Sequence, residues 1–237
     1  MKIKTFLSPN FDKKKRLKSS IKIIVIHYTG MQSERESLTR LCANNSKVSS
    51  HFLINRVGKI YRLVQDHHIA WHAGKSSWGK YRNLNRNSIG IELVNKGHQF
   101  GYQNFTKKQI LSLIKVCQKI IRKYKKKKKK NIVGHSDIAP LRKIDPGEKF
   151  PWNKLAENNI GIWNKKNKTV LKKFRKIKVS KNEKLKFSKK ISNIGYVFTS
   201  KKKNITTSVT KAFQRHHRKE LVNGSIDKEC LIIAEKL

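Results

Sequence analysis

Three short apolar runs determine which folds are open to this chain. Residues 21–26 read Ile-Lys-Ile-Ile-Val-Ile, a run apolar enough for a strand in the centre of a sheet. Residues 88–94 have the same character, and Ile132-Val133 is a shorter run of the same kind. We therefore expect buried β-strands at these three places.

Segments with helical spacing separate these runs. Residues 33–45 carry acidic side chains in their first turn, where the helix dipole favours carboxylates. A longer helix begins near Thr106, which suits an N-cap, and it ends in six lysines at 125–130, interpreted as a solvated helix end and loop. Val57-Gly58 lies between two further apolar runs and predicts a β-hairpin. Strands that alternate with helices predict an α/β fold, with a mixed central β-sheet flanked by helices.

The last third of the chain differs in composition. Residues 161–184 are rich in Lys and Asn, which is typical of a linker with little core of its own. Apolar residues at helical spacing then recur in three segments, at 185–196, 206–217 and 227–237. The expected organisation is a lead-in at 1–20, a main domain at 21–160, the linker at 161–184 and a small three-helix domain at 185–237. A helical cap on the main domain is the alternative for the last segment.

The chain is strongly basic. It has 57 Lys and Arg residues against 14 Asp and Glu, a formal net charge of +43. Such a charge attracts polyanions, including nucleic acids and anionic cell-wall polymers, and makes association sensitive to salt. The excess is spread along the whole chain, and no nucleic-acid-binding motif accompanies it. We interpret it as a general bias toward Lys, and we expect no specific nucleic-acid partner.

Cysteines and apolar segments indicate the compartment. Cys42, Cys117 and Cys230 are too few and too scattered for a disulfide framework or a cysteine metal site. Residues 1–20 contain no apolar segment followed by a cleavage site, and no stretch approaches the roughly 18 apolar residues of a membrane span. We expect a cytoplasmic monomer without a transmembrane segment. A periplasmic or cell-envelope location is the alternative, if the assigned start has removed a signal peptide.

A constrained loop at 131–147 carries the strongest candidates for chemistry. It presents His135, Lys143 and Asp145 around Pro140 and ends in Pro146-Gly147. An imidazole and a carboxylate supply two of the three protein ligands that a catalytic zinc site needs. The third candidate is His27, which follows the run at 21–26.

Each of these residues also has a purely structural interpretation. His135 could cap a strand, Asp145 could cap a turn, and His27 could be a core histidine. Glu92 adds to the case for a site, because a carboxylate inside an apolar run needs a proton, a partner or a function. The adjacent pair His216-His217 points in two directions on a helix and is interpreted as exposed and polar.

Several blocks in this order resemble the zinc-dependent N-acetylmuramoyl-L-alanine amidases, a family that includes peptidoglycan recognition proteins. The blocks are Val-Ile-His-Tyr-Thr at 25–29, Ala-Trp-His-Ala-Gly at 70–74, Ser-Ile-Gly-Ile-Glu at 88–92 and the loop from Gly134 to Gly147. The resemblance implies one catalytic Zn²⁺ on His27, His135 and Asp145, with Glu92 and Lys143 as catalytic residues. It also implies substrate-binding roles for Tyr28, Trp71, His72 and Asn85.

The family's reaction is hydrolysis of the amide between the lactyl group of N-acetylmuramic acid and L-alanine. The expected partner is therefore peptidoglycan or a free or 1,6-anhydro muropeptide, and these substrates are not distinguished by the residues. The tail from Ala212 to Asp227 resembles the three-helix peptidoglycan-binding domain of cell-wall hydrolases. The alternative function is a non-catalytic peptidoglycan-recognition protein that keeps the fold and only binds.

Overall fold

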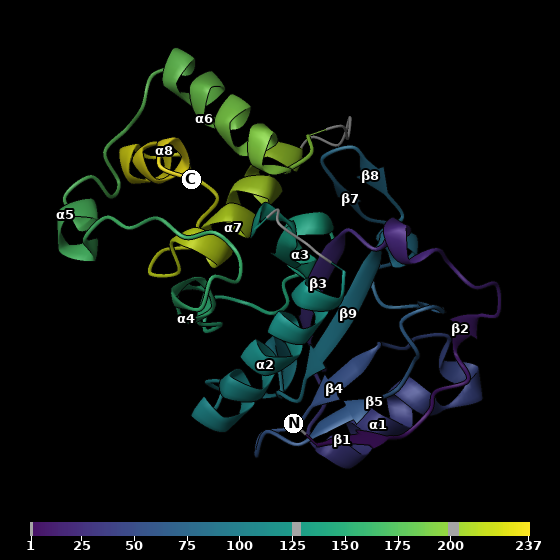
Figure 1. Ribbon diagram of the computed structural model, residues 1–237. Helices are drawn as coiled ribbons and strands as arrows, with labels where there is room; N and C mark the ends of the chain where they lie inside the picture. The colour runs from purple at the N-terminus through teal and green to yellow at the C-terminus, as the bar shows by residue number, and fades with distance from the viewer. Residues whose placement is uncertain (1, 125–128, 199–203) are drawn as a thin grey trace.

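A six-stranded sheet forms the centre of the molecule (Figure 1). The computed structural model describes residues 2–124, 129–198 and 204–237. In spatial order the strands are β1 (Ile3–Thr5), β5 (Ile60–Arg62), β4 (Phe52–Ile54), β9 (Ser88–Leu93), β3 (Ile23–Tyr28) and β10 (Ile132–Gly134). Strands β4, β9, β3 and β10 are parallel to one another, and β5 is antiparallel to β4. The predicted mixed sheet is thereby confirmed.

Smaller elements lie around this sheet. Two short antiparallel pairs are β2 (Phe11–Asp12) with β6 (Ile69–Ala70), and β7 (Ser77–Trp78) with β8 (Tyr81–Arg82). Short 3₁₀ helices occupy Lys18–Ser20, Asn44–Ser46, Leu84–Asn87, His98–Phe100 and Lys129–Asn131. The helices are α1 (Glu34–Cys42), α2 (Lys107–Lys123), α3 (His135–Ile138), α4 (Trp152–Glu157), α5 (Lys168–Lys172), α6 (Lys181–Ile194), α7 (Ile205–His217) and α8 (Lys228–Glu235).

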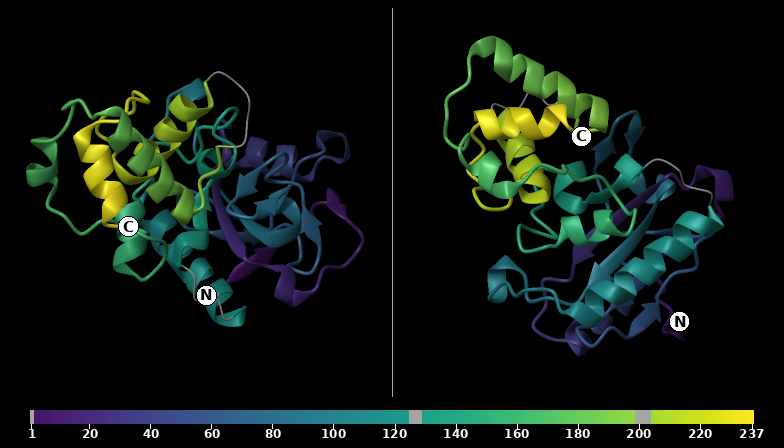
Figure 2. Two further views of the ribbon diagram at one scale, coloured as in Figure 1. Left: turned by 90° about the horizontal axis from the view of Figure 1, so that it is seen from above. Right: turned by 60° about the vertical axis from the view of Figure 1, so that its left-hand side comes forward.

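Alternation along β3 separates the two faces of the sheet. Ile24 and Ile26 belong to a core that is shared with the apolar side of α2, which runs across this face (Figure 2). Ile23 and Val25 point to the opposite face and belong to a second core, because successive side chains of a strand alternate between faces. His27 continues this second set at the end of the strand.

The second face is covered in two places. Helix α1 packs there against Leu53 of β4 and Tyr61 of β5 through Leu41. Helices α3, α6, α7 and α8 share a core with Ile23 and Val25 of β3. In Figure 1, α6, α7 and α8 lie at the opposite end of the molecule from α1, and α3 lies nearer the centre. Residues of α1 and of α3 line one cleft together with Glu92 of β9, and the candidate site lies in this cleft.

The C-terminal helices are attached to the sheet by a common core. The second core joins Val25 of β3 to Phe187 of α6 and Phe213 of α7. Helix α5 lies inside the expected linker, and its Leu171 is buried in the same core. The three expected C-terminal helices are present, and α6 begins at Lys181, four residues before the expected boundary. The division of the chain into domains stays a prediction.

The two adjacent histidines of α7 were predicted wrongly. His216 is 4% exposed and His217 is 3% exposed, so neither is a surface residue. The ring of His216 stacks on Trp152 at 3.7 Å between centroids, and its Nδ1 lies 2.7 Å from Asp137 Oδ2. Helix α7 is covered on more than one side, and that coverage depends on partners far away in the sequence.

Other local expectations can be compared directly. The Thr106 hydroxyl accepts the Gln109 N–H at 3.1 Å and caps α2, as predicted. Gly58 has φ of +84° in the connection between β4 and β5, which confirms the hairpin. Residues 125–128 of the lysine run lie outside the described residues. Strand β1 was not predicted, because only its pairing with β5 makes it a strand.

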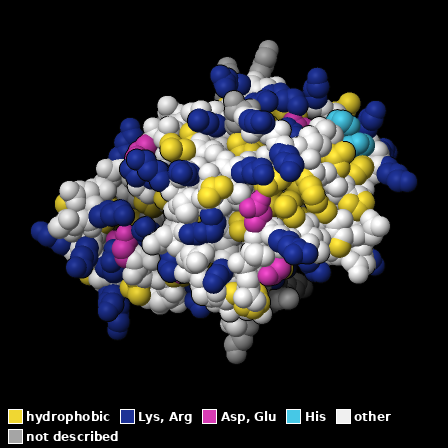
Figure 3. All heavy atoms as spheres, turned by 90° about the horizontal axis from the view of Figure 1, so that it is seen from below, with side chains coloured by type: hydrophobic (Ala, Val, Ile, Leu, Met, Phe, Trp, Pro, Cys, Tyr) yellow, Lys and Arg dark blue, Asp and Glu magenta, His cyan; other side chains and the backbone are white. Residues whose placement is uncertain are grey.

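Basic side chains far outnumber acidic ones at the surface. On the face seen in Figure 3, Lys and Arg are spread widely and acidic side chains are few. No helix among the described residues has the length and apolar character needed to cross a membrane.

Candidate metal centre and active-site cleft

Three adjacent parallel strands deliver side chains to one edge of the sheet. His27 lies near the end of β3 and is the register partner of Glu92 on β9. Gly134 of β10 pairs with Ile26, so His135, the next residue, emerges level with His27. Parallel strands end at the same edge, and ligands in α/β proteins bind there.

The loop after β10 brings Asp145 back to this edge. The backbone N–H of Ser136 donates to the Asp145 carbonyl at 2.8 Å, and the Lys143 N–H donates to Ala139 at 3.0 Å. The Asp145–Pro146 peptide bond is cis. The two hydrogen bonds hold the loop against α3, and Lys143 and Asp145 both line the same cleft.

Three buried ligand atoms converge at the edge. His27 Nδ1 lies 3.0 Å from His135 Nδ1 and 3.1 Å from Asp145 Oδ2, and His135 Nδ1 lies 3.2 Å from Asp145 Oδ2. Ligand atoms about 2.0–2.2 Å from one tetrahedral metal ion would be roughly 3.3 Å apart. The structure thus brings together the three residues predicted as ligands, in a group that could bind a metal ion.

Hydrogen-bond directions support a cation at this point. His135 Nε2 lies 3.2 Å from the Ala73 carbonyl, which can only accept, so this nitrogen carries the proton. The His135 Nδ1 lone pair then faces the Asp145 carboxylate at the distance given above. Two acceptors so close together repel each other unless a proton or a cation lies between them. Two imidazole nitrogens and one carboxylate oxygen are a suitable donor set for a divalent transition-metal ion.

Burial and mutual charge set the protonation of the ligand group. Burial, together with repulsion from His135, lowers the pKa of His27 to about 4. Burial alone would raise the pKa of Asp145, but the contacts with His135 and His27 hold it well below its usual range. A neutral imidazole and an ionised carboxylate are the forms that bind metal ions.

Glu92 and Lys143 occupy the rim of the metal-binding group. Burial, with a smaller contribution from the charge of Asp145, raises the pKa of Glu92 to about 8, although Lys143 acts in the opposite direction. Within the described chain, Glu92 Oε2 is buried without a hydrogen-bond partner. Lys143 is partly exposed and lines the same cleft. A carboxyl group that titrates near neutral pH is suited to proton transfer.

The cleft above these residues has a volume of about 420 Å³ and is lined by residues from both coverings of the sheet. Of the four predicted substrate-binding residues, Tyr28, Trp71 and His72 line it. The Tyr28 hydroxyl lies 2.9 Å from His98 Nδ1, and Trp71 Nε1 donates to Asp12 at 2.7 Å. Asn85 is not among the lining residues, and its side chain holds backbone amides instead.

Sequence reasoning missed Arg142. This residue lines the cleft, and its Nη2 donates to the Lys75 carbonyl at 2.9 Å and also to the Ala73 carbonyl. It thereby joins the loop that carries Asp145 to the segment that follows Trp71. The sequence did hold a clue to Arg142. It directly precedes Lys143, and both cations lie on the constrained loop between the predicted ligands His135 and Asp145.

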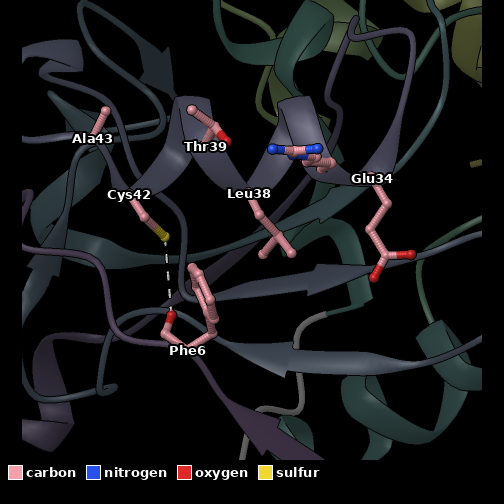
Figure 4. Close-up of a pocket in the computed structure, with 7 residues that line it drawn as sticks. Phe6, Glu34, Leu38, Thr39, Cys42 and Ala43 are labelled. Atoms are coloured by element: carbon pink, nitrogen blue, oxygen red, sulfur yellow. Dashed lines mark hydrogen bonds between the residues drawn. The ribbon is translucent and has the colours of Figure 1, made fainter.

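A larger cavity lies elsewhere and carries no comparable chemistry. It measures about 690 Å³ and is lined by residues of α1 and by Phe6 (Figure 4). Its one carboxylate belongs to Glu34, which accepts hydrogen bonds from Asn55 Nδ2 at 2.7 Å and from the Tyr61 hydroxyl. Cys42 Sγ contacts the Phe6 carbonyl there. The metal-binding cleft, and not this cavity, is the candidate active site.

Comparison with known proteins identifies the family. A family model described as N-acetylmuramoyl-L-alanine amidase matches residues 17–148, more than half of the chain and the whole of the metal-binding group. The chain belongs to that family. The predicted family and the predicted enzyme class, an N-acetylmuramoyl-L-alanine amidase, are confirmed.

Curated members of this amidase family extend the match. N-acetylmuramoyl-L-alanine amidase AmiD from Escherichia coli K12 is 36% identical over 230 residues, which cover 92% of this chain and 82% of AmiD. The 1,6-anhydro-N-acetylmuramyl-L-alanine amidase AmpD from Haemophilus influenzae is 35% identical over 168 residues, covering 64% of this chain and 89% of AmpD.

Solved structures of family members agree with the fold. The complex of Escherichia coli AmiD with an anhydro-N-acetylmuramic acid peptide matches with a TM-score of 0.79 and 35% identity, covering 95% of this chain and 91% of AmiD. AmpDh3 from Pseudomonas aeruginosa matches with a TM-score of 0.79 and 31% identity, covering 92% of this chain and 91% of that chain. Because the AmiD match covers 95% of the chain, it includes C-terminal helices as well as the sheet.

Proposed function

We propose that this amidase uses one zinc ion, held by His27, His135 and Asp145, to cleave the amide between N-acetylmuramic acid and L-alanine. The observation that carries the proposal is the convergence of two imidazole nitrogens and one carboxylate oxygen, 3.0–3.2 Å apart, at the floor of a cleft. Zinc accepts this donor set in catalytic sites that keep one position open. Membership in the amidase family supports the choice of metal and reaction.

Each rim residue has a defined part in the proposed reaction. When bound, zinc supplies a Lewis acid beside the amide carbonyl and lowers the pKa of water to about 7. Glu92 takes the proton of the attacking water and passes it to the nitrogen of the leaving L-alanine. The Lys143 ammonium stabilises the negative charge that develops on the carbonyl oxygen. The main-chain pairing of β9 with β3 keeps Glu92 beside the ligand group during these steps.

We propose peptidoglycan-derived muropeptides as the substrate class. The AmiD complex contains anhydro-N-acetylmuramic acid with an L-Ala-D-γ-Glu-L-Lys peptide, and an AmpDh3 complex contains an anhydromuramic pentapeptide. The cleft of this chain is open and lined by both polar and aromatic residues, including Tyr28 and Trp71. Such a lining suits a sugar with an attached peptide.

A muropeptide cleavage assay tests the proposal. The purified protein is incubated with 1,6-anhydro muropeptide and with intact peptidoglycan, and the products are identified by mass. We expect a free peptide with an L-alanine amino terminus, abolished by His135→Ala and by a zinc chelator and restored by added Zn²⁺. Binding of muropeptide without cleavage by the zinc-loaded protein would instead support the recognition function and contradict the proposal.

A further inference from the structure

A buried chain of hydrogen bonds lies behind His27, on the side away from the proposed metal. His27 Nε2 lies 3.0 Å from His72 Nδ1, and His72 Nε2 lies 3.1 Å from the Ser88 hydroxyl. The Ser88 hydroxyl donates in turn to the Leu84 carbonyl at 2.6 Å. His27, His72 and Ser88 are all buried.

The carbonyl at the end fixes the direction of the whole chain. Since a carbonyl only accepts, the Ser88 hydroxyl uses its proton there and accepts from His72 Nε2. A neutral imidazole has one N–H, so His72 Nδ1 is an acceptor and takes the proton of His27 Nε2. The remaining nitrogen, His27 Nδ1, then presents its lone pair to the ligand group.

Ala73, which follows His72, fixes the position of the proton on His135, the other histidine ligand. The Ala73 carbonyl accepts from His135 Nε2 at 3.2 Å, which leaves His135 Nδ1 as a lone pair toward Asp145. Arg142 Nη2 lies 3.4 Å from His135 Nε2, but its two protons go to the Ala73 and Lys75 carbonyls, so His135 Nε2 remains the donor to Ala73. Two consecutive residues, His72 and Ala73, therefore contact the outer nitrogens of both histidines.

Asn85 holds this dipeptide in place. Its Oδ1 accepts the backbone N–H of His72 at 3.1 Å and that of Ala73 at 2.7 Å. One amide oxygen thus fixes the main chain at both contact points. Asn85 was predicted to bind substrate, but its observed contacts are with this backbone.

The His72 ring packs against Ser88 and Gly90 of strand β9. Ser88, Gly90 and Glu92 alternate along β9 and share the face opposite the α2 core. A Cβ added at Gly90 would lie 2.5 Å from His72 Cγ and 2.6 Å from His72 Nδ1. Gly90 therefore leaves the room that the ring occupies, and Ser88 fixes the orientation of the ring within it.

We propose that the dipeptide His72-Ala73, seated on Ser88 and Gly90 and held by Asn85, fixes both histidine ligands with the proton on Nε2 and the lone pair on Nδ1. His72 and Asn85 are positioning residues that act through His27 and His135. Outer partners of this kind raise metal affinity by holding the ligand ring in its binding orientation. The inference rests on the metal site of the proposed function, and its first test needs no metal.

The first test reads the tautomers directly in the metal-free protein. Long-range ¹H–¹⁵N NMR spectra of uniformly labelled protein distinguish a protonated Nε2 from a protonated Nδ1 in each histidine, and assignment uses His27→Gln and His135→Gln variants. We expect His27, His72 and His135 each to carry a proton on Nε2, and any further proton shared between the Nδ1 atoms and Asp145 takes the place of the cation in the metal-free protein. An unprotonated Nε2 on His27 or His135 would overturn the proposal, whether or not the protein cleaves muropeptides.

The second test compares paired variants by their affinity for Zn²⁺ alone, measured by competition with a chelator. His72→Phe keeps a ring and loses the acceptor, and we expect Zn²⁺ affinity to fall about 10–100-fold. His72→Asn places an amide oxygen near the position of Nδ1, and we expect affinity within about threefold of the unchanged protein. Thermal unfolding of the metal-free forms verifies that each variant folds.

Asn85 provides a second, independent pair. Asn85→Ala removes the acceptor for both backbone amides, whereas Asn85→Asp keeps it. We expect a loss of about tenfold in Zn²⁺ affinity for the first and a much smaller change for the second. Equal affinities of His72→Phe, Asn85→Ala and the unchanged protein would contradict the positioning role. Failure of the unchanged protein to bind Zn²⁺ would refute the proposed function while leaving the NMR result to decide the hydrogen-bond chain.

Discussion

Glu92 stands directly beside His27, because the two residues are register partners on the parallel strands β9 and β3. A carboxyl group and a proposed metal ligand are thus placed by main-chain pairing in the middle of the sheet, and not by loops. Sites built on strands are held more rigidly than sites built on loops. This relationship gives the first prediction.

Glu92→Gln should keep the shape of the cleft and remove the proton-accepting group. We expect Zn²⁺ binding to stay stoichiometric, while turnover falls about 10²–10⁴-fold, the usual contribution of a general base. Metal analysis and single-turnover cleavage of muropeptide measure the two effects separately. Full activity in the variant would remove Glu92 from the mechanism.

Lys143 gives a prediction about charge. Lys143→Met keeps the length of the side chain and removes its ammonium, and we expect turnover to fall about 10²–10³-fold with little change in Zn²⁺ affinity. Lys149→Met serves as the control, because Lys149 lies close by in the chain, is exposed and does not line the cleft. A loss that appears only in KM would assign Lys143 to substrate binding instead.

A substitution at Gly90 tests whether the position of the His72 ring matters for metal binding. Gly90→Ala places a methyl group where the His72 ring lies, so we expect Zn²⁺ affinity to fall about tenfold or more as the ring is displaced. Ile89→Val is the matched control, because Ile89 lies on the same strand but faces the α2 core. The control should lose about 0.5–1.5 kcal/mol of stability and no metal affinity. Unchanged affinity in Gly90→Ala would mean that the ring can move without consequence.

The buried carboxylate of Asp66 should make part of the free energy of unfolding depend on pH in the acid range. Burial alone would raise its pKa, but the charge of Arg62 and hydrogen bonds from Lys123 and Tyr124 hold it well below the ordinary value of 3.8. A depressed carboxyl pKa stabilises the folded state above the unfolded pKa, and this stabilisation is lost as the pH falls below about 4. Asp66→Asn should cost about 1–3 kcal/mol at pH 7. Denaturant titrations should show the difference shrinking toward pH 3, and a constant difference would contradict this account.

Much of the site was predictable because its polar residues lie within or directly after short apolar runs. His27 follows the apolar run at 21–26 near the end of β3, His135 follows β10, and Glu92 is a carboxylate within β9. Such positions fall at the carboxyl edge of a parallel sheet whatever the details of packing. The α/β class follows from the same alternation of strands and helices.

The rest depends on partners that the sequence does not place together. Asn85 was predicted to bind substrate, yet its contacts with His72 and Ala73 depend on where the main chain of residues 72–73 passes. His216 is buried through Asp137, which lies 79 residues earlier in the chain. Periodicity describes one segment at a time, so it does not reveal contacts of this kind.

The central claim is that His27, His135 and Asp145 hold one divalent ion. A crystal structure of the zinc-loaded protein, with anomalous scattering measured on both sides of the zinc absorption edge, tests it most directly. We predict one strong anomalous peak about 2.0–2.2 Å from His27 Nδ1, His135 Nδ1 and a carboxylate oxygen of Asp145. A zinc peak at another place, or none in crystals of protein that still cleaves muropeptide, would contradict the account.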